Sequence, residues 1–259
     1  MTERRSVLFR GATVVYSCYG RRGAPAVALI PGFLETRAAF VPLAEQWASR
    51  YRVIVVDVLG HGESGCTGYV HTVEDQAEAV LAVLKAERIR FFRVAGHSMG
   101  GYIALALMDR VPERLRGVLL MNTHPFADSE ERRALRRRAM EIAKKEKSSY
   151  LHAAIPALVA PENVDRLKAE LQAMVEAART MPVQGILAAQ EGMMARPDRT
   201  DVLRRTYGFP VAVVAGAEDP VIPLEVTEAF WHLPAVTERR LLPGGHLSFL
   251  EAGPLCWSA

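Results

Sequence analysis

Cysteine is scarce in this sequence, and the few cysteines follow no pattern. Three occur among the 259 residues, at Cys18, Cys66 and Cys256. So sparse and uneven a set argues against a disulfide framework and against a zinc site. We interpret each as a plain thiol, which suits a reducing compartment.

Long apolar runs are also missing. Residues 211–217 form one of the longest, and they are far too few to span a bilayer. The first residues include basic side chains but no apolar core with a small-residue cleavage site, so we predict no secretory signal. We therefore expect a soluble, cytoplasmic protein with no membrane partner.

Charge of one sign is in only slight excess. The formal net charge is +3, which gives no reason to expect a nucleic-acid partner. Half of the residues are hydrophobic, so a chain of this length can bury a substantial core without disulfides or metal. The sequence leaves the oligomeric state open.

Short β-rich runs alternate with amphipathic stretches, which is typical of the α/β class, with a mostly parallel sheet covered by helices. We predict strands at residues 7–9, 13–17, 26–30, 52–56, 92–95, 117–121, 210–215 and 238–242. The clearest predicted helices are residues 38–49, 73–86 and 99–110, with Thr72 as the N-cap of the second. The chain ends soon after the last strand, which leaves little room for another full helix.

The alternation stops between residues 124 and 200. This stretch has a helical pattern interrupted by Pro156, Pro161, Pro182 and Pro197, and it contains no convincing strand. An insertion of this size between two strands predicts a helical cap over the strand ends.

The most informative motif is Gly96-His97-Ser98-Met99-Gly100, which follows a predicted strand and opens a helix. A glycine-flanked serine in that context is typical of a nucleophile elbow, where a tight turn holds the serine oxygen out at the edge of the sheet. The helix N-terminus beside it favours developing negative charge.

With this motif in place, the sequence resembles the α/β-hydrolase superfamily over nearly its whole length, and most closely its lidded esterase- and lactonase-like members. The resemblance implies a three-layer sandwich, in which residues 1–123 and 201–259 form the core and residues 124–200 the cap. It also implies Ser98 as the nucleophile.

The resemblance also implies an oxyanion hole. In Leu29-Ile30-Pro31-Gly32-Phe33-Leu34-Glu35, the residue after the glycine gives one backbone N–H, and Met99 gives the other. Two fixed donors of this kind stabilise the transition-state oxyanion by about 3 kcal/mol each. The family usually has histidine where this chain has Pro31, which removes a side chain that could support the loop but keeps the backbone donor of Phe33.

The triad acid and base are assigned by resemblance and by chain order. Asp219 in the segment Gly216-Ala217-Glu218-Asp219-Pro220 is the expected acid, with Glu218 as its rival and the neutral Asn122 in a position that holds the acid in some relatives. His246, after a glycine pair, is the expected base, because serine, acid and histidine follow in the order of this fold.

The loop Asp57-Val58-Leu59-Gly60-His61-Gly62-Glu63-Ser64 also resembles a family landmark. We interpret it as structural, with the aspartate and glycines shaping a turn near the site and Ser64 capping or orienting it. His61 is the weaker alternative to His246 as the base.

The predicted cap carries the least specific signals. Its basic stretch around Arg136, Arg137 and Arg138 is interpreted as a solvated helix face above an apolar stripe, and attraction of anionic substrates is the alternative. The apolar stripe consists of Leu135, Ala139 and Ile142. We predict substrate contacts by His124, Leu158 and Met193, although core packing explains the methionines equally well.

These residues predict acyl transfer from a small carboxylic ester or lactone through an acyl-enzyme on Ser98, with no metal or organic cofactor. The same triad is compatible with C–C bond hydrolysis, with a lyase and with a perhydrolase. A ligand-binding module of low turnover on the same fold is an alternative of another class.

Overall fold

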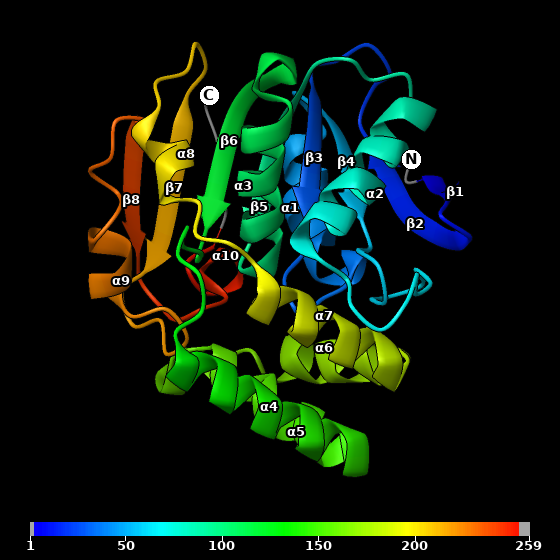
Figure 1. The fold of residues 1–259 in the computed structure, drawn as a ribbon, viewed down its shortest axis with the longest axis vertical. Helices are drawn as coiled ribbons and strands as arrows, with labels where there is room; N and C mark the ends of the chain where they lie inside the picture. The colour runs from blue at the N-terminus through cyan, green and yellow to red at the C-terminus, as the bar shows by residue number, and fades with distance from the viewer. Residues whose placement is uncertain (1–2, 254–259) are drawn as a thin grey trace.

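The computed structural model describes residues 3–253, and its centre is an eight-stranded sheet (Figure 1). The strands follow the spatial order β1-β2-β4-β3-β5-β6-β7-β8. β1 and β2 pair antiparallel, β2 also pairs antiparallel with β4, and every pairing from β4 to β8 is parallel. The strands are β1 Glu3–Phe9, β2 Ala12–Tyr19, β3 Ala26–Ile30, β4 Arg52–Val56, β5 Phe92–His97, β6 Leu115–Met121, β7 Val211–Gly216 and β8 Glu238–Leu242.

The eight predicted strands are confirmed, but β1 begins four residues earlier than predicted, at Glu3, and the other ends move by at most two residues. β3, β4 and β7 are buried along their whole length, as expected for apolar runs covered on both faces. β8 alternates between half-buried and exposed residues because it lies at the edge of the sheet. The predicted α/β fold class is therefore correct.

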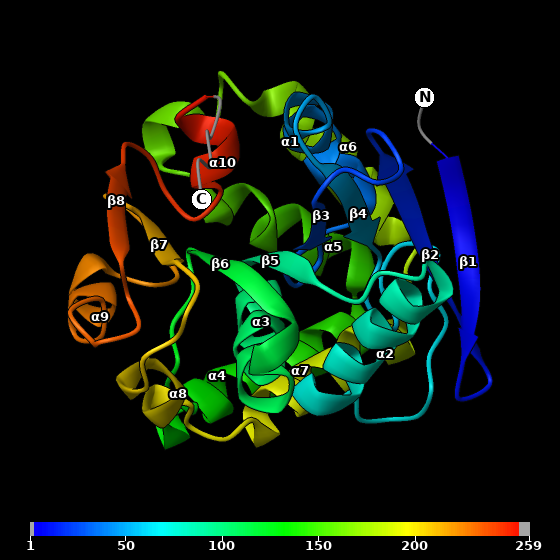
Figure 2. The same cartoon turned by 90° about the horizontal axis from the view of Figure 1, so that it is seen from above.

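Helices cover both faces of the sheet (Figure 2). On one face lie α2, Val73–Ala86, and α3, Met99–Arg110, whose apolar side chains join one core cluster. On the other face lie α1, Val41–Trp47, and α10, Ser248–Glu251, which join the second cluster. The short helix α9, Leu224–Glu228, packs near β7.

The ends of the helices follow from local sequence. Thr72 caps α2 as predicted, because its Oγ1 accepts the backbone N–H of Asp75 at 3.0 Å. The single helix predicted at residues 38–49 is confirmed only in part. It is divided into a 3-10 turn, Arg37–Phe40, and α1, because Pro42 lacks an N–H and favours the start of a new helix.

The segment between β6 and β7 is helical, and its residues 130–195 lie beyond the carboxyl ends of the strands (Figure 1). Three of its breaks fall at predicted prolines, because Pro156 and Pro161 begin 3-10 turns and Pro182 precedes α7. The break at Glu146, between α4 and α5, has no proline. The helices are α4 Glu130–Lys145, α5 Lys147–Ala154, α6 Lys168–Arg179, α7 Val183–Ala195 and α8 Thr200–Arg204.

The apolar stripe predicted for α4 is wrong. Leu135 and Ile142 are 56% and 44% exposed, whereas Met140 and Ala143 are the residues that α4 buries. The inner face also carries Arg136, whose charge is neutralised by an ion pair, so hydrophobic periodicity alone misplaces the buried side.

Within residues 3–253, no helix is long and apolar enough to cross a membrane. Cys18 is buried and Cys66 half-buried, both as free thiols, and burial raises the pKa of Cys18 to about 11. Cys256 lies outside the described residues.

Candidate active site

Ser98 occupies the turn between β5 and α3 in a strained conformation. Its backbone φ is 50° and its ψ is −113°, which non-glycine residues rarely adopt. The Ser98 N–H donates to Met121 O at 2.9 Å, and the hydroxyl of Thr123 donates to Ser98 O at 2.8 Å. These contacts with β6 and the residues after it hold the turn in place.

Two glycines make this turn possible. A Cβ on Gly96 would lie 2.1 Å from Gly100 O, and a Cβ on Gly100 would lie 2.1 Å from Ile30 O. Both contacts are with backbone atoms, which cannot move away as a flexible side chain can. The glycines therefore let α3 approach the neighbouring strands and hold Ser98 at the edge of the sheet.

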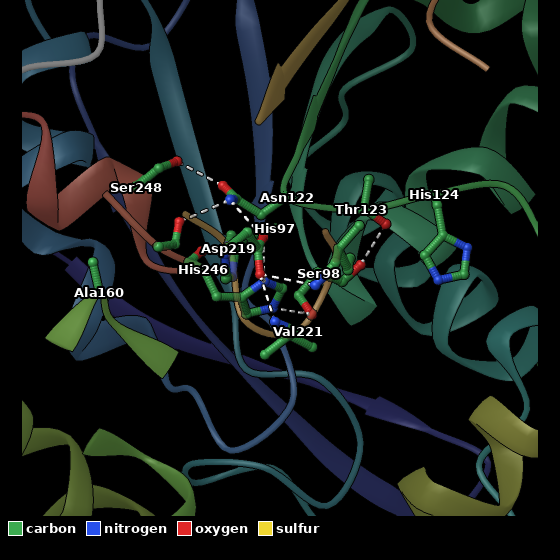
Figure 3. Close-up of polar contacts among 12 residues, drawn as sticks. His97, Ser98, Asn122, Thr123, His124, Ala160, Asp219, Val221, His246 and Ser248 are labelled. Carbon is green, nitrogen blue, oxygen red and sulfur yellow. Dashed lines mark hydrogen bonds and ion pairs between the residues drawn. The ribbon is translucent and has the colours of Figure 1, made fainter. Parts of the chain in front are cut away.

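The structure brings Ser98, His246 and Asp219 together from three separate segments (Figure 3). His246 Nε2 lies 2.8 Å from Ser98 Oγ, and His246 Nδ1 lies 2.8 Å and 3.0 Å from the two Asp219 oxygens. A continuous chain of hydrogen bonds thus runs from carboxylate to hydroxyl. Such a chain allows an imidazole to take a proton from a serine and return it to a leaving group.

Asp219 is held as an ionised carboxylate. Its Oδ1 accepts the N–H groups of Val221 and Ile222, at 2.8 Å and 2.9 Å. Burial favours the neutral acid, but the nearby His246 and these hydrogen bonds outweigh it and lower the pKa of Asp219. The rival Glu218 is exposed, and its raised pKa comes from Glu162.

Asn122 is a residue that the sequence prediction weighed only as a substitute acid. Its Nδ2 donates to Asp219 Oδ2 at 3.0 Å and to Gly245 O at 3.2 Å, and its Oδ1 accepts the hydroxyl of Ser248 at 2.6 Å. Asn122 therefore fixes the acid and the loop before the base at once (Figure 3). Its polar side chain at the end of a buried strand was the available signal.

The expected oxyanion donors lie beside the serine turn. Met99 is the first residue of α3, and Phe33 follows Gly32 in the loop after β3. In the described part of the chain, neither backbone N–H donates to another group. Both are therefore free to bind an oxyanion, which is the property that this role requires.

A buried pair of ionisable side chains supports the oxyanion loop. Glu35 Oε2 accepts the N–H of Gly32, and Glu35 Oε1 lies 2.8 Å from His97 Nδ1. His97 Nε2 in turn donates to His246 O at 2.8 Å. Burial lowers the pKa of His97, but the Glu35 carboxylate more than compensates and raises it. The pair thus connects the oxyanion loop, the serine turn and the base loop.

The loop after β4 is structural in its contacts. Asp57 accepts from the backbone and the side chain of Arg37, at 2.8 Å and 2.7 Å, and Ser64 Oγ connects Val15 N with Asp57 O. His61 is fully buried, its Nδ1 lies 3.3 Å from Leu59 O, and its ring packs edge-on against Phe33. Burial lowers its pKa to about 4.

The three residues predicted to touch substrate differ in burial, because His124 and Leu158 are half-buried and Met193 is buried. In Figure 3, Thr123 lies between Ser98 and His124. The carbonyl of Leu158 accepts the N–H of His246 at 2.7 Å, which ties the segment after α5 to the base loop. Met193 is buried on α7. Contacts of these residues with a substrate remain a prediction.

In residues 3–253, no group of three or more histidine, cysteine or acidic residues is placed to hold a metal ion. The site's polar atoms instead bind one another in the hydrogen-bond chain described above.

Comparison with known proteins identifies the family of the chain. The model of the family described as alpha/beta hydrolase fold matches residues 25–253. The chain belongs to this family. The match covers β3 to β8 and the helical segment between β6 and β7.

Individual relatives of this alpha/beta hydrolase are similar over most of its length. The putative carbamate hydrolase RutD of Azorhizobium caulinodans is 28% identical over 70% of this chain and 69% of its own. The 3-oxoadipate enol-lactonase 1 of Acinetobacter baylyi is 25% identical over 97% and 94%. A malate-bound thermophilic esterase from Thermogutta terrifontis superposes with a TM-score of 0.88, at 28% identity, over 96% and 93%.

Proposed function

We propose that this protein is a serine hydrolase that cleaves a small carboxylic ester or lactone through an acyl-enzyme on Ser98. The observation that carries the proposal is the unbroken hydrogen-bond chain from Asp219 through His246 to Ser98, in a strained turn at a helix N-terminus. The esterase and lactonase relatives support the same bond type.

The proposed reaction has two halves, acylation of Ser98 and hydrolysis of the acyl-enzyme. His246 Nε2 takes the hydroxyl proton as Ser98 Oγ attacks the carbonyl carbon, and the N–H groups of Phe33 and Met99 stabilise the oxyanion. The proton passes to the leaving alkoxide as the C–O bond breaks. Water, deprotonated by His246, then releases the acid and restores the serine.

Replacing the nucleophile tests this proposal. Ser98→Ala removes the attacking oxygen, and we expect hydrolysis of 4-nitrophenyl acetate to fall by about 10³-fold or more. The release of 4-nitrophenolate measures it. Ser149→Ala, which makes the same change at an exposed position of α5, is the control and is expected to keep full activity. Equal activity of the two variants would refute the proposal.

A further inference from the structure

The side chain of Glu251 accepts all of its hydrogen bonds at one buried oxygen. Glu251 is the last residue of α10 and is 8% exposed. Its Oε2 accepts the N–H of Gly245 at 2.8 Å, the N–H of Ala160 at 2.9 Å and the side-chain amide of Asn163 at 2.9 Å. Its Oε1 is shielded from solvent and has no hydrogen-bond partner among residues 3–253. The contacts of this side chain therefore depend on a single acceptor atom.

The three donors belong to two distant parts of the chain. Gly245 directly precedes His246, whereas the other two donors lie between α5 and α6, in the helical segment that joins β6 to β7. A backbone contact strengthens the same junction, because the carbonyl of Leu158 accepts the N–H of His246 at 2.7 Å. The base loop and residues 158–163 therefore form one hydrogen-bonded unit.

The glycine pair before His246 makes this close packing possible. A Cβ on Gly244 would lie 2.7 Å from the Glu251 Cβ, and a Cβ on Gly245 would lie 2.6 Å from Ala160 N. Gly244 also has a φ of 100°, in the left-handed region that favours glycine. The two glycines thus let the acid and the helical segment approach the loop from different sides.

Glu251 completes the support of the backbone that carries the base. The four backbone polar atoms of Gly245 and His246 all have hydrogen-bond partners. These partners are Glu251, Asn122, Leu158 and His97. The direction of the imidazole follows from the backbone to which it is attached, and its Nε2 lies 2.8 Å from Ser98 Oγ. A displaced loop would lengthen this contact, and proton transfer depends steeply on such distances.

We propose that Glu251 is a positioning residue, which aligns His246 and couples this alignment to the helical segment that lies against the base loop. The inference rests on the proposed function, because it concerns the proton transfers of that reaction. Glu251 acts through the N–H groups of Gly245 and Ala160 rather than on the reacting atoms. The base is aligned with Ser98 while residues 158–163 are in place.

Two acetate esters with different leaving groups test the alignment. Phenolate is a stronger base than 4-nitrophenolate, so phenyl acetate depends more on the proton that His246 returns to the leaving group. Glu251→Met removes the acceptor at similar length. We expect its kcat/KM to fall about tenfold for 4-nitrophenyl acetate and about thirtyfold or more for phenyl acetate. Glu251→Gln keeps one acceptor oxygen and should recover most of both losses.

A change on the other side of the junction tests the coupling. Asn163→Leu removes one donor to Glu251 Oε2 and leaves the base loop unaltered. We expect kcat/KM to fall about threefold for phenyl acetate and less for 4-nitrophenyl acetate. Glu228→Gln, which alters an exposed acid of α9, is the control and should keep both values.

The outcomes separate this proposal from the proposed function. Equal losses on the two esters with Glu251→Met indicate a smaller folded fraction, and they would overturn the positioning role. Glu251→Gln no more active than Glu251→Met would also overturn it, and an unchanged ratio of the two esters with Asn163→Leu would overturn the coupling. Each of these results leaves the serine hydrolase intact. Only a wild type that hydrolyses neither ester would count against the serine hydrolase itself.

Discussion

At the scale of single residues, the candidate site depends on buried polar groups whose partners come from distant segments. Asp219 accepts hydrogen bonds from His246, Asn122 and two backbone N–H groups, and these bonds stabilise the negative charge on both of its oxygens. A carboxylate held in this way fixes one tautomer of His246 and leaves Nε2 as the acceptor of the serine proton.

Asn122→Ala tests how much the amide contributes to holding Asp219 and His246 in place. The hydrogen bond from Asn122 lowers the pKa of Asp219, so its loss should raise that pKa. We also expect kcat near neutral pH to fall about tenfold, because the loop before His246 loses an anchor. Steady-state kinetics with 4-nitrophenyl acetate measures kcat, and an unchanged kcat would contradict the assigned contact.

Residue chemistry also explains which site residues the sequence could reveal. Ser98, Asp219 and His246 each lie in a local motif whose order along the chain is informative. Asn122 and Glu35 were not predicted as supports, because their partners are 97 and 62 residues away and become neighbours only when β6 meets β7 and β3 meets β5.

At the scale of elements, the oxyanion loop after β3 is supported by a side chain rather than by its own backbone alone. The ring of Pro31 offers the loop no hydrogen bond, and Glu35 supplies a support through Gly32 and His97. Glu35 therefore gives the loop the side-chain support that Pro31 lacks.

Glu35→Gln should weaken this support. Without the carboxylate, burial lowers the pKa of His97, and the pair loses its charge-assisted contact. Because the oxyanion donors act in the transition state, we expect kcat to fall about tenfold with little change in KM. Steady-state kinetics with 4-nitrophenyl butyrate measures the split. Glu45→Gln on the exposed side of α1 is the control, and a change confined to KM would contradict the role.

The approach of α3 to the sheet is equally specific. Gly100→Ala places a methyl group 2.1 Å from Ile30 O, so α3 or β3 must shift, and we expect Tm to fall by several degrees or more with a loss of activity. Gly68→Ala, with no atom within 4 Å of the added carbon, should leave both nearly unchanged. Thermal unfolding of the two variants decides, and similar Tm values would contradict the packing described.

The elements also mark where sequence patterns were insufficient. Periodicity predicted Leu135 and Ile142 on the inner side of α4, but the inner side is partly polar because Arg136 pairs with Asp128 there. A buried ion pair has no hydrophobic signature, so it could be found only from the packed structure. Pro156, Pro161 and Pro182 of the same segment, by contrast, marked three breaks correctly, although the break at Glu146 has no proline.

At the scale of the whole molecule, the helical segment between β6 and β7 is tied to the base loop. Glu251 Oε2 accepts the N–H groups of Ala160 and Gly245, at 2.9 Å and 2.8 Å, and Leu158 O accepts the N–H of His246. The part of the chain expected to choose the substrate is therefore in direct contact with the base. We propose that the chain divides into a core, residues 1–123 and 201–259, and a cap, residues 124–200.

In the proposed function, the fold makes one hydroxyl, that of Ser98, nucleophilic. Treating the protein with a fluorophosphonate and mapping the adduct by mass spectrometry tests this directly. We predict an adduct on Ser98, with loss of ester hydrolysis in proportion to labelling. An adduct on another residue, or full hydrolysis after complete labelling of Ser98, would contradict the account.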